Sequence, residues 1–157
     1  MSENQVELSA IDLKIMRALQ QDGRLSNAEL AKLIGISPSS CWNHTQRLFK
    51  IGAILDVRAR INPNMVQRET IVLVGVVLDR STPESFAEFE RAAKQLNNVL
   101  ECYLVAGEVD YFLKIRVKDL VAFNRFHSEK IIALPGVRQV RTFFVLNEVT
   151  SDGLLTF

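Results

Sequence analysis

The amino-acid sequence predicts an α+β protein with two domains. Two capped helical segments joined by a short bend lie between Ser26 and Ile51, and β-branched strands alternate with amphipathic helices after residue 70. An Asn-Pro-Asn break at residues 62–64 separates these two patterns. We therefore assign residues 1–61 to the first domain, residues 62–69 to a linker and residues 70–157 to the second domain.

The first domain contains a predicted helix-turn-helix. Ser26 and Glu29 have the spacing of a capping box, in which each side chain bonds a backbone N–H group of the first helical turn. Gly35 follows the apolar positions of this helix and can adopt the left-handed conformation that ends it. Ser37 and Pro38 are then an N-cap and a first helical residue. A bend this short between two helices is typical of DNA-binding proteins.

A further helix precedes this pair. Ser9 and Asp12 form a second cap-like pattern, which predicts a helix from Ala10 to about Gln21 that ends before Gly23. Together the three helices have apolar positions at helical spacing. We expect a core made of Ile11, Ile15, Leu19, Leu30, Leu33, Ile34, Ile36, Leu48 and Ile51.

The second helix of the bend, about Pro38 to Ile51, carries the functional signal. It contains no acidic residue, and its basic and hydrogen-bonding side chains suit phosphate oxygens and base edges. The alternative is a structural helix with a solvated polar face, but the capped helix and glycine turn before it favour DNA binding. The predicted DNA-contacting residues of this helix are Ser37, Ser39, Ser40, Asn43, His44, Gln46, Arg47 and Lys50.

The segment from Ala53 to Ile61 alternates like a strand and could form a wing beside the three helices. Arg58 and Arg60 would share one face of that ribbon. Arg58 is a predicted DNA contact, although simple solvation of both arginines explains the pattern equally well.

The second domain has the predicted element order βαββαβ, which is the ferredoxin-like arrangement. The expected strands and helices are Thr70–Asp79 (strand), a helix after Ser81 to about Asn97, Leu100–Ala106 (strand), Tyr111–Val117 (strand), a helix from Asp119 to about Ala133, and Val137–Val149 (strand).

Both helices of such a fold cover one face of the sheet, yet the first and last strands are apolar on both faces. We therefore expect a second copy of the chain to cover the other face, giving a homodimer. Lys114 and Arg116 on the third strand would then reach the rim or pair with acids across the interface.

Composition and charge limit the expected partners and location of the protein. The net charge of 157 residues is only +1, so DNA affinity would need several copies of the first domain acting together. Cys41 and Cys102 have no metal-ligand spacing, and we expect both side chains to be buried. Two unpaired cysteines indicate a reducing compartment. No apolar run reaches membrane-spanning length and the N-terminal residues lack a signal-peptide core, so a cytoplasmic location without membrane contact is expected.

Catalysis finds little support in the sequence. No Ser/His/Asp or Cys/His set, glycine-rich phosphate loop or metal cluster is visible, and no cofactor or metal is expected. The competing interpretation is a stand-alone amino-acid sensor of ferredoxin-like fold that regulates an enzyme. Such a sensor would not need the capped helices between Ser26 and Ile51.

The whole chain resembles the Lrp/AsnC ("feast/famine") transcriptional regulators. The motifs that carry the resemblance are Ile11–Ile15, Leu19–Arg24, Glu29–Ala31, Ser37–Ser39, Arg47–Leu48, Gly52–Ile54, Asn62–Pro63, Glu101–Tyr111, Leu134–Val137 and Arg141–Thr142. The resemblance implies a winged helix-turn-helix on a small-molecule-binding domain that dimerises through its sheet. It further implies assembly into tetramers or octamers and binding of an amino acid between dimers.

By position, the resemblance implies an effector pocket at the Gly107/Asp110 turn. Asp110 can accept a hydrogen bond from an ammonium group, and the backbone N–H groups of a glycine turn can hold a carboxylate. From the residues alone, this turn could equally serve only the fold. The implied effector-binding residues are Leu104, Gly107, Asp110, Leu134, Pro135, Gly136, Phe143 and Val145.

The chain departs from the family pattern in the predicted recognition helix. His44 and the Thr45–Gln46 step replace more basic or apolar residues, so the operator sequence of relatives cannot be transferred. Trp42 is bulky where many relatives have an aliphatic residue. We expect it to pack in the core rather than to face DNA.

Overall fold

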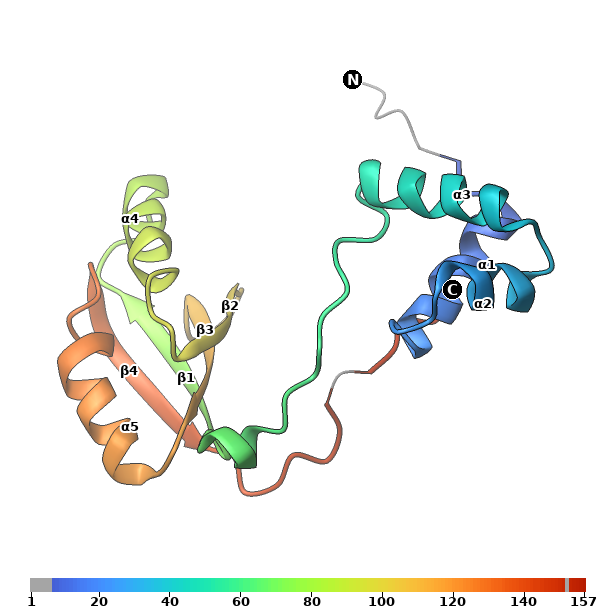
Figure 1. The fold of residues 1–157 in the computed structure, drawn as a ribbon. Coiled ribbons are helices and arrows are strands. Elements are labelled where there is room, and N and C mark those ends of the chain that lie inside the picture. Colours follow the sequence, from blue (N-terminus) through green and yellow to red (C-terminus); the bar gives the residue numbers. More distant parts are fainter. Residues whose placement is uncertain (1–6, 152) are drawn as a thin grey trace. The chain divides into compact units, whose positions relative to one another are not determined.

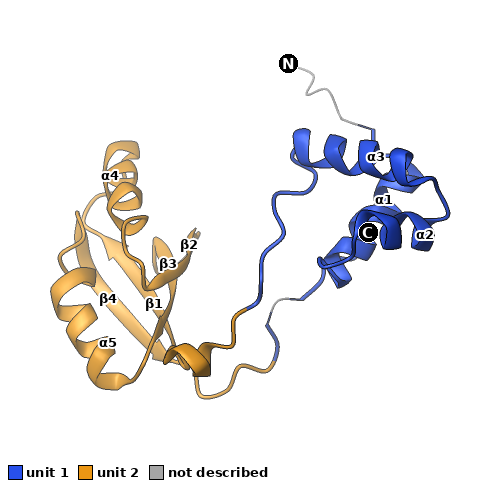
Figure 2. Cartoon of the chain, viewed as in Figure 1, with its two compact units in different colours: residues 1–60, 150–157 blue, residues 61–149 orange. Residues whose placement is uncertain are grey.

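The computed structural model describes residues 7–151 and 153–157. The chain divides into two compact units (Figure 2): residues 1–60 with 150–157, and residues 61–149. The expected second domain extended to residue 157, whereas the last eight residues group with the first unit. The predicted absence of a signal peptide concerned the N-terminal residues. Of these, residues 1–6 lie outside the described residues.

In its described residues the first unit contains the helices α1 Ala10–Gln21, α2 Asn27–Ile34 and α3 Pro38–Lys50 (Figure 1). Both predicted capping boxes form, with Ser9 accepting from the Asp12 N–H and Ser26 from the Glu29 N–H. Gly35 has φ 82°, so it ends α2 in the left-handed conformation that the sequence predicted. The short bend between α2 and α3 therefore follows from local capping chemistry.

The core of this unit is smaller than predicted. Ile15, Leu30 and Leu48 are buried as expected, and Cys41 is buried beside them. Leu33 is 65% exposed and Ile51 is 37% exposed, so both core predictions were wrong. Leu33 lies about 100° around the helix from Ile34, which packs against the core, because an α-helix turns by that angle per residue.

Residues 53–61 form no strand, contrary to the expected ribbon. In the described residues no second segment pairs with this one, and an unpaired extended segment leaves its backbone groups to water. The side chains from Leu55 to Ile61 are exposed.

The C-terminal residues pack along α1. The Gln20 side-chain amide donates to the Leu155 carbonyl at 2.9 Å and accepts from the Leu155 N–H at 3.1 Å. Arg17 Nε donates to the Phe157 carbonyl at 2.6 Å, and its guanidinium lies 5.4 Å from the centre of the Phe157 ring. These side-chain contacts explain why the tail groups with the first unit, and no sequence pattern indicated them.

The second unit begins with a short 3₁₀ turn, η1 Pro63–Val66, and then has the predicted order βαββαβ. Its sheet has the strand order β2-β3-β1-β4 with every neighbouring pair antiparallel. This confirms the ferredoxin-like arrangement. The elements are β1 Thr70–Leu78, α4 Pro83–Ala93, β2 Val99–Leu104, β3 Tyr111–Val117, α5 Leu120–Phe126, a π-helical turn η2 His127–Ile131, and β4 Val137–Phe144.

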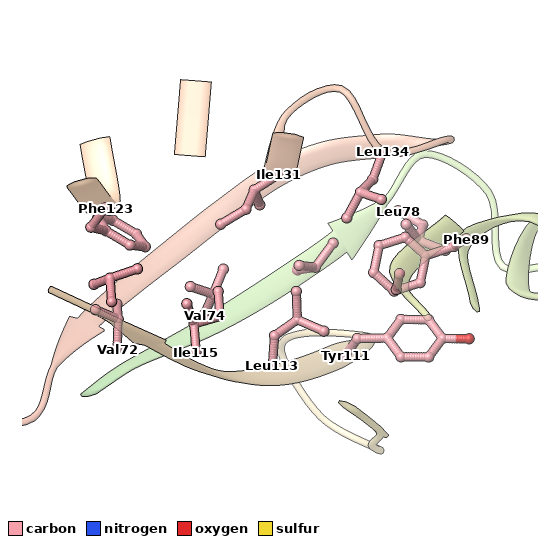
Figure 3. Packing of buried hydrophobic residues seen from close by; sticks show 13 residues of the cluster. Val72, Val74, Leu78, Phe89, Tyr111, Leu113, Ile115, Phe123, Ile131 and Leu134 are labelled. Carbon is pink, nitrogen blue, oxygen red and sulfur yellow. The ribbon is translucent and has the colours of Figure 1, made fainter. Parts of the chain in front are cut away.

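Alternate residues of β1 and β3 make the core of this unit with both helices. Figure 3 shows Val72 and Val74 of β1 beside Leu113 and Ile115 of β3. Phe89 of α4 and the α5–η2 residues Phe123 and Ile131 belong to the same buried cluster. One face of the sheet is thus covered by both helices.

The largest differences from the predicted element ends are at α4, α5 and β4. Helix α4 stops at Ala93 because the chain turns to start β2, with the Val99 N–H bonding the Leu96 carbonyl. Helix α5 gives way to η2, since a purely α-helical path would put Ile131 about 80° around the axis from Phe123. Strand β4 ends at Phe144, opposite Val72 of β1, rather than at Val149.

The other face of the sheet, which we call the open face, carries Ile71, Leu73 and Val77 of β1 with Phe112 of β3 and Phe143 of β4. Leu73 is 37% exposed and Phe143 is 50% exposed. The two cations of β3 pair with acids of the same chain rather than with acids across an interface. Lys114 lies 3.1 Å from Glu101, and Arg116 lies 2.7 Å from Glu148.

Candidate functional sites

Helix α3 presents a polar stripe to solvent. Ser39, Asn43, Gln46 and Lys50 are all exposed, and their spacing of four, three and four residues places them on one face. No acidic residue occurs between Pro38 and Lys50. This stripe offers amide, hydroxyl and ammonium groups without a carboxylate that would repel phosphate.

The serines at the start of α3 have local roles. Ser37 is the N-cap and its hydroxyl accepts from the Ser40 N–H at 3.2 Å. The hydroxyls of Ser37 and Ser39 lie 3.2 Å apart. Pro38 is also tied to α2, because its carbonyl accepts from the Asn27 side chain at 2.8 Å.

His44 and Arg47, on another flank of α3, are held by α1. His44 Nδ1 lies 2.8 Å from Asp12 Oδ1, and Arg47 Nη1 donates to Asp12 Oδ2 at 2.9 Å. Arg47 Nη2 also donates to the Glu7 carbonyl at 3.1 Å. Both predicted DNA-contacting side chains are therefore already engaged within the domain.

Asp12 is the only buried charged side chain among the described residues, with 1% exposure. Burial raises the pKa of Asp12, but hydrogen bonds from His44 and from the backbone and hydroxyl of Ser9 offset this and lower the pKa to about 2. The carboxylate is charged and fully partnered. The sequence indicated only the cap with Ser9, since a bond that spans 32 or 35 residues leaves no local pattern.

The structure also shows where three other residues of this unit lie, namely Trp42, Thr45 and Arg58. Trp42 is 55% exposed, so its predicted place in the core was wrong. Its position on α3 turns it about 100° away from buried Cys41. Thr45 instead faces inward, and its hydroxyl has no hydrogen-bond partner in the described structure. Arg58 is exposed and pairs with Asp56, its Nε donating at 2.7 Å.

One part of the implied effector set gathers at the end of β1. The carboxylate of Asp110 accepts from the Leu78 N–H at 2.7 Å, and the Asp79 N–H bonds the Gly136 carbonyl at 2.8 Å. Gly107 has φ 149°, and nothing lies within 4 Å of where a Cβ would be. Leu134 is buried in the core, Pro135 is exposed, and Leu104 ends β2 with 56% exposure.

The other part, Phe143 and Val145, lies toward the opposite end of the sheet. Phe143 is paired with Leu73, and the Val145 N–H bonds the Ile71 carbonyl. Leu73 is five residues before Leu78, where Asp110 binds, which corresponds to about 17 Å along a strand. The centre of the Phe143 ring lies 6.5 Å from that of Phe112, which follows Asp110 by two residues, so the two parts of the set are displaced from each other along the sheet.

Cys102 was also predicted to be buried, and this was wrong: it is exposed on β2. Strand β2 is at the edge of the sheet, so its side chains have neighbours on one side only.

Comparison with known proteins decides the family. Residues 8–54 match the model of a winged helix-turn-helix DNA-binding domain, and residues 71–155 match that of the Lrp/AsnC ligand binding domain. The chain belongs to the Lrp/AsnC family. It is 39% identical over 149 residues to the leucine-responsive regulatory protein of Escherichia coli, covering 95% of this chain and 91% of that protein. The Haemophilus influenzae protein of the same name is 39% identical over 94% of this chain and 89% of its own.

Solved structures of transcriptional regulators have the same fold. A Neisseria meningitidis transcriptional regulator in complex with L-Met matches with a TM-score of 0.89 and 29% identity, covering 96% of this chain and 97% of its own. An AsnC family regulator of Agrobacterium tumefaciens matches with a TM-score of 0.89 and 30% identity, covering 95% and 97%.

This membership confirms the predicted class of function. The chain is a DNA-binding transcriptional regulator with a ligand-binding domain, and its relatives are regulators rather than enzymes. The competing interpretation, a sensor without a DNA-binding domain, was wrong, because residues 8–54 match a DNA-binding model. No described helix is both long and apolar enough to cross a membrane.

The buried Asp12 carboxylate predicts an acid-sensitive first unit. Its pKa is about 2 in the folded chain against an ordinary value of 3.8, so its stabilisation is present above about pH 4 and is lost as the pH falls through 2. The shift corresponds to about 2 kcal/mol. At pH 5 the wild type should have a larger free energy of unfolding than Asp12→Asn. Urea unfolding should show this difference shrinking by about the same amount between pH 5 and pH 2.

A matched control is Asp22→Asn. Hydrogen bonds from the Arg24 backbone and side chain also lower the pKa of Asp22, but its carboxylate lies in water. Its replacement should change the pH dependence much less. An equal effect of the two variants would contradict the assignment to Asp12.

Proposed function

We propose that paired copies of this chain bind a pseudo-palindromic duplex DNA site, each placing α3 in the major groove. The observation that carries the proposal is the exposed, carboxylate-free stripe of α3 on a domain that matches DNA-binding relatives. Ser39, Asn43 and Gln46 are suited to base edges, and Lys50 is suited to a phosphate. His44 and Arg47 would contact DNA from the flank held by Asp12, with Ser37 and Ser40 at the helix start and Arg58 beyond its end.

Lys50→Gln tests this placement of α3. Lys50 is exposed and has no partner among the described residues, so the change should leave the unfolding temperature unaltered. Loss of one phosphate contact should weaken DNA binding and lower the slope of log K against log salt by about 0.9. Fluorescence anisotropy with a labelled duplex at several salt concentrations measures both quantities.

Lys94→Gln is the matched control, because it removes the same charge from the second unit at the end of α4. It should leave the salt slope unchanged. If Lys50→Gln also left affinity and slope unchanged, α3 would not be the DNA-contacting helix.

We further infer a homodimer through the open face of the sheet. The apolar side chains Leu73 and Phe143 are exposed there, and the charges beside them are paired within the chain by Glu101 and Glu148. A second copy would therefore bury apolar surface without having to neutralise a charge. Isologous pairing also presents two α3 helices, as a pseudo-palindromic site requires. Further assembly to tetramers or octamers is proposed from the family resemblance.

Leu73→Asp should convert the dimer to a single chain. The new carboxylate would lie across from Lys114, which makes it tolerable in a monomer, but its burial in a dimer is costly. Light scattering at micromolar concentration reads the mass. Leu120→Asp, an exposed change at the start of α5 outside the open face, should leave the mass unchanged, and a dimer that survives Leu73→Asp would place the interface elsewhere.

The proposed effector is an amino acid. One similar structure is a complex with L-Met, and this chain carries a carboxylate, Asp110, beside an open glycine turn at Gly107. One Asp110 oxygen accepts the Leu78 N–H, and the other is free to accept from an ammonium group. Leu104 and the Leu134–Gly136 turn lie at the same end of the sheet.

Phe143 and Val145 suit an apolar effector side chain, but they lie toward the other end of the sheet. We propose that a pocket that uses them together with Asp110 is completed by a second chain. This arrangement couples the effector to assembly, since ligand that binds between copies stabilises the assembled form. A change of assembly then alters the spacing of the paired α3 helices.

Asp110→Asn tests the pocket without removing its structural bond. The amide oxygen can still accept from the Leu78 N–H, whereas the negative charge for an ammonium group is lost. In a thermal-shift screen of the twenty amino acids, a ligand at one hundred times its dissociation constant should stabilise the wild type by about 2.7 kcal/mol. The variant should lose that shift and keep its own unfolding temperature, and a shift that persists would place the pocket elsewhere.

The proposed location is the cytoplasm. The duplex DNA to which the chain binds lies there in the bacteria that supply its relatives.

A further inference from the structure

The strongest unexplained feature of the first unit is the carboxylate of Asp12. A capping box needs only Ser9 and Asp12, and both of its bonds are made: the Ser9 hydroxyl oxygen accepts from the Asp12 N–H at 3.1 Å, and Asp12 Oδ2 accepts from the Ser9 N–H at 2.8 Å. The same carboxylate nevertheless takes two further partners from α3. Charged groups are rarely buried unless they are fully partnered, so these bonds hold α3 in one rotation against α1.

The two partners keep unused donors at the surface. Arg47 has five N–H groups, and its guanidinium bonds Asp12 through Nη1 and the Glu7 carbonyl through Nη2. Its side chain is still 43% exposed. The His44 side chain is 28% exposed, and only its Nδ1 atom is taken by Asp12. Arg47 is thus held at two points and His44 at one, while other nitrogen atoms of both side chains remain available.

The charges of this cluster offset one another. The Asp12 carboxylate balances the Arg47 guanidinium, so the pair adds little net attraction for a phosphate. The pair instead fixes the orientation of the guanidinium. A guanidinium held at two points has few rotamers, so it loses little conformational entropy when it binds DNA. Phosphate contacts of this kind set the register in which neighbouring side chains meet base edges.

We infer that Asp12 is a positioning residue for DNA recognition, fixing Arg47 and His44 of α3 so that their unused N–H groups meet the phosphate backbone in one register. The inference rests on the proposed DNA contact of α3. Asp12 itself touches no DNA in this arrangement and acts through the two side chains that it holds.

A purely structural Asp12 predicts a different result. Loss of a structural residue lowers the fraction of folded protein, and this reduces binding to every DNA sequence in the same proportion. Loss of a positioning residue lowers discrimination instead. Since Asp12→Asn also removes a negative charge, binding to unrelated DNA should hold or increase.

The experiment compares two duplexes with the full-length protein. One is an operator selected from a random DNA pool by retention on the wild type, and the other is its scrambled sequence. Fluorescence anisotropy at fixed salt gives both dissociation constants, and their ratio measures discrimination. Emission from Trp42, the only tryptophan of the chain, checks that α3 is folded in each variant.

For Asp12→Asn we expect the ratio to fall about tenfold or more, through weaker operator binding, while scrambled DNA binds as tightly as before or more tightly. Asp22→Asn removes the same charge from an exposed site of the same unit and should leave the ratio unchanged. Equal loss of affinity for both duplexes in Asp12→Asn would overturn the inference.

Arg47→Lys decides the question if Asp12→Asn does not fold. Lysine keeps the charge, but its single ammonium group cannot bridge Asp12 and the Glu7 carbonyl as the guanidinium does. A lower ratio with unchanged binding to scrambled DNA supports positioning, and an unchanged ratio overturns it. If Lys50→Gln and Arg47→Lys both left all DNA binding unaltered, the proposed role of α3 would itself fail, which is a distinct outcome.

Discussion

The buried carboxylate of Asp12 is the interaction that organises the first unit. Ionised groups are stable in a protein interior only when hydrogen bonds and opposite charge replace the lost water. Ser9, His44 and Arg47 supply that replacement, and two of these three residues belong to α3. The helix with the exposed polar stripe is consequently tied to α1 by an ion pair as well as by the apolar contacts of Ile15, Cys41 and Leu48.

The second unit depends on a different constraint, which is that its sheet carries apolar residues on both faces. Its covered face is satisfied within the chain by Phe89, Phe123 and Ile131, which pack on β1 and β3. The open face has apolar residues but no helix, and its cations are already neutralised by Glu101 and Glu148. The proposed homodimer through this face would therefore depend on the removal of apolar surface from water rather than on charge pairing. The proposed effector pocket would likewise be completed by a second copy, because Asp110 bonds Leu78 whereas Phe143 pairs with Leu73.

Local patterns predicted local structure well. The bounds of α1 and β3 matched, both capping boxes formed, and Gly35 adopted the left-handed conformation, because each of these depends on neighbours within a few residues. Burial was predicted less well at helix flanks. Leu33 and Trp42 are apolar and at plausible spacing, yet they are exposed, since hydropathy does not say where the next helix will pack.

The sequence by itself determined the two-domain organisation, the helix-turn-helix, the order βαββαβ and, through its motifs, the Lrp/AsnC family. These features follow from capping, periodicity and turn residues, which act between near neighbours in the chain. Only the tertiary structure decided which α3 side chains are free and which are held, that Lys114 and Arg116 find acids in their own chain, and that the C-terminal residues pack on α1. Each of these depends on contacts between residues far apart in sequence, and the positions that meet are set by how whole helices and strands pack together.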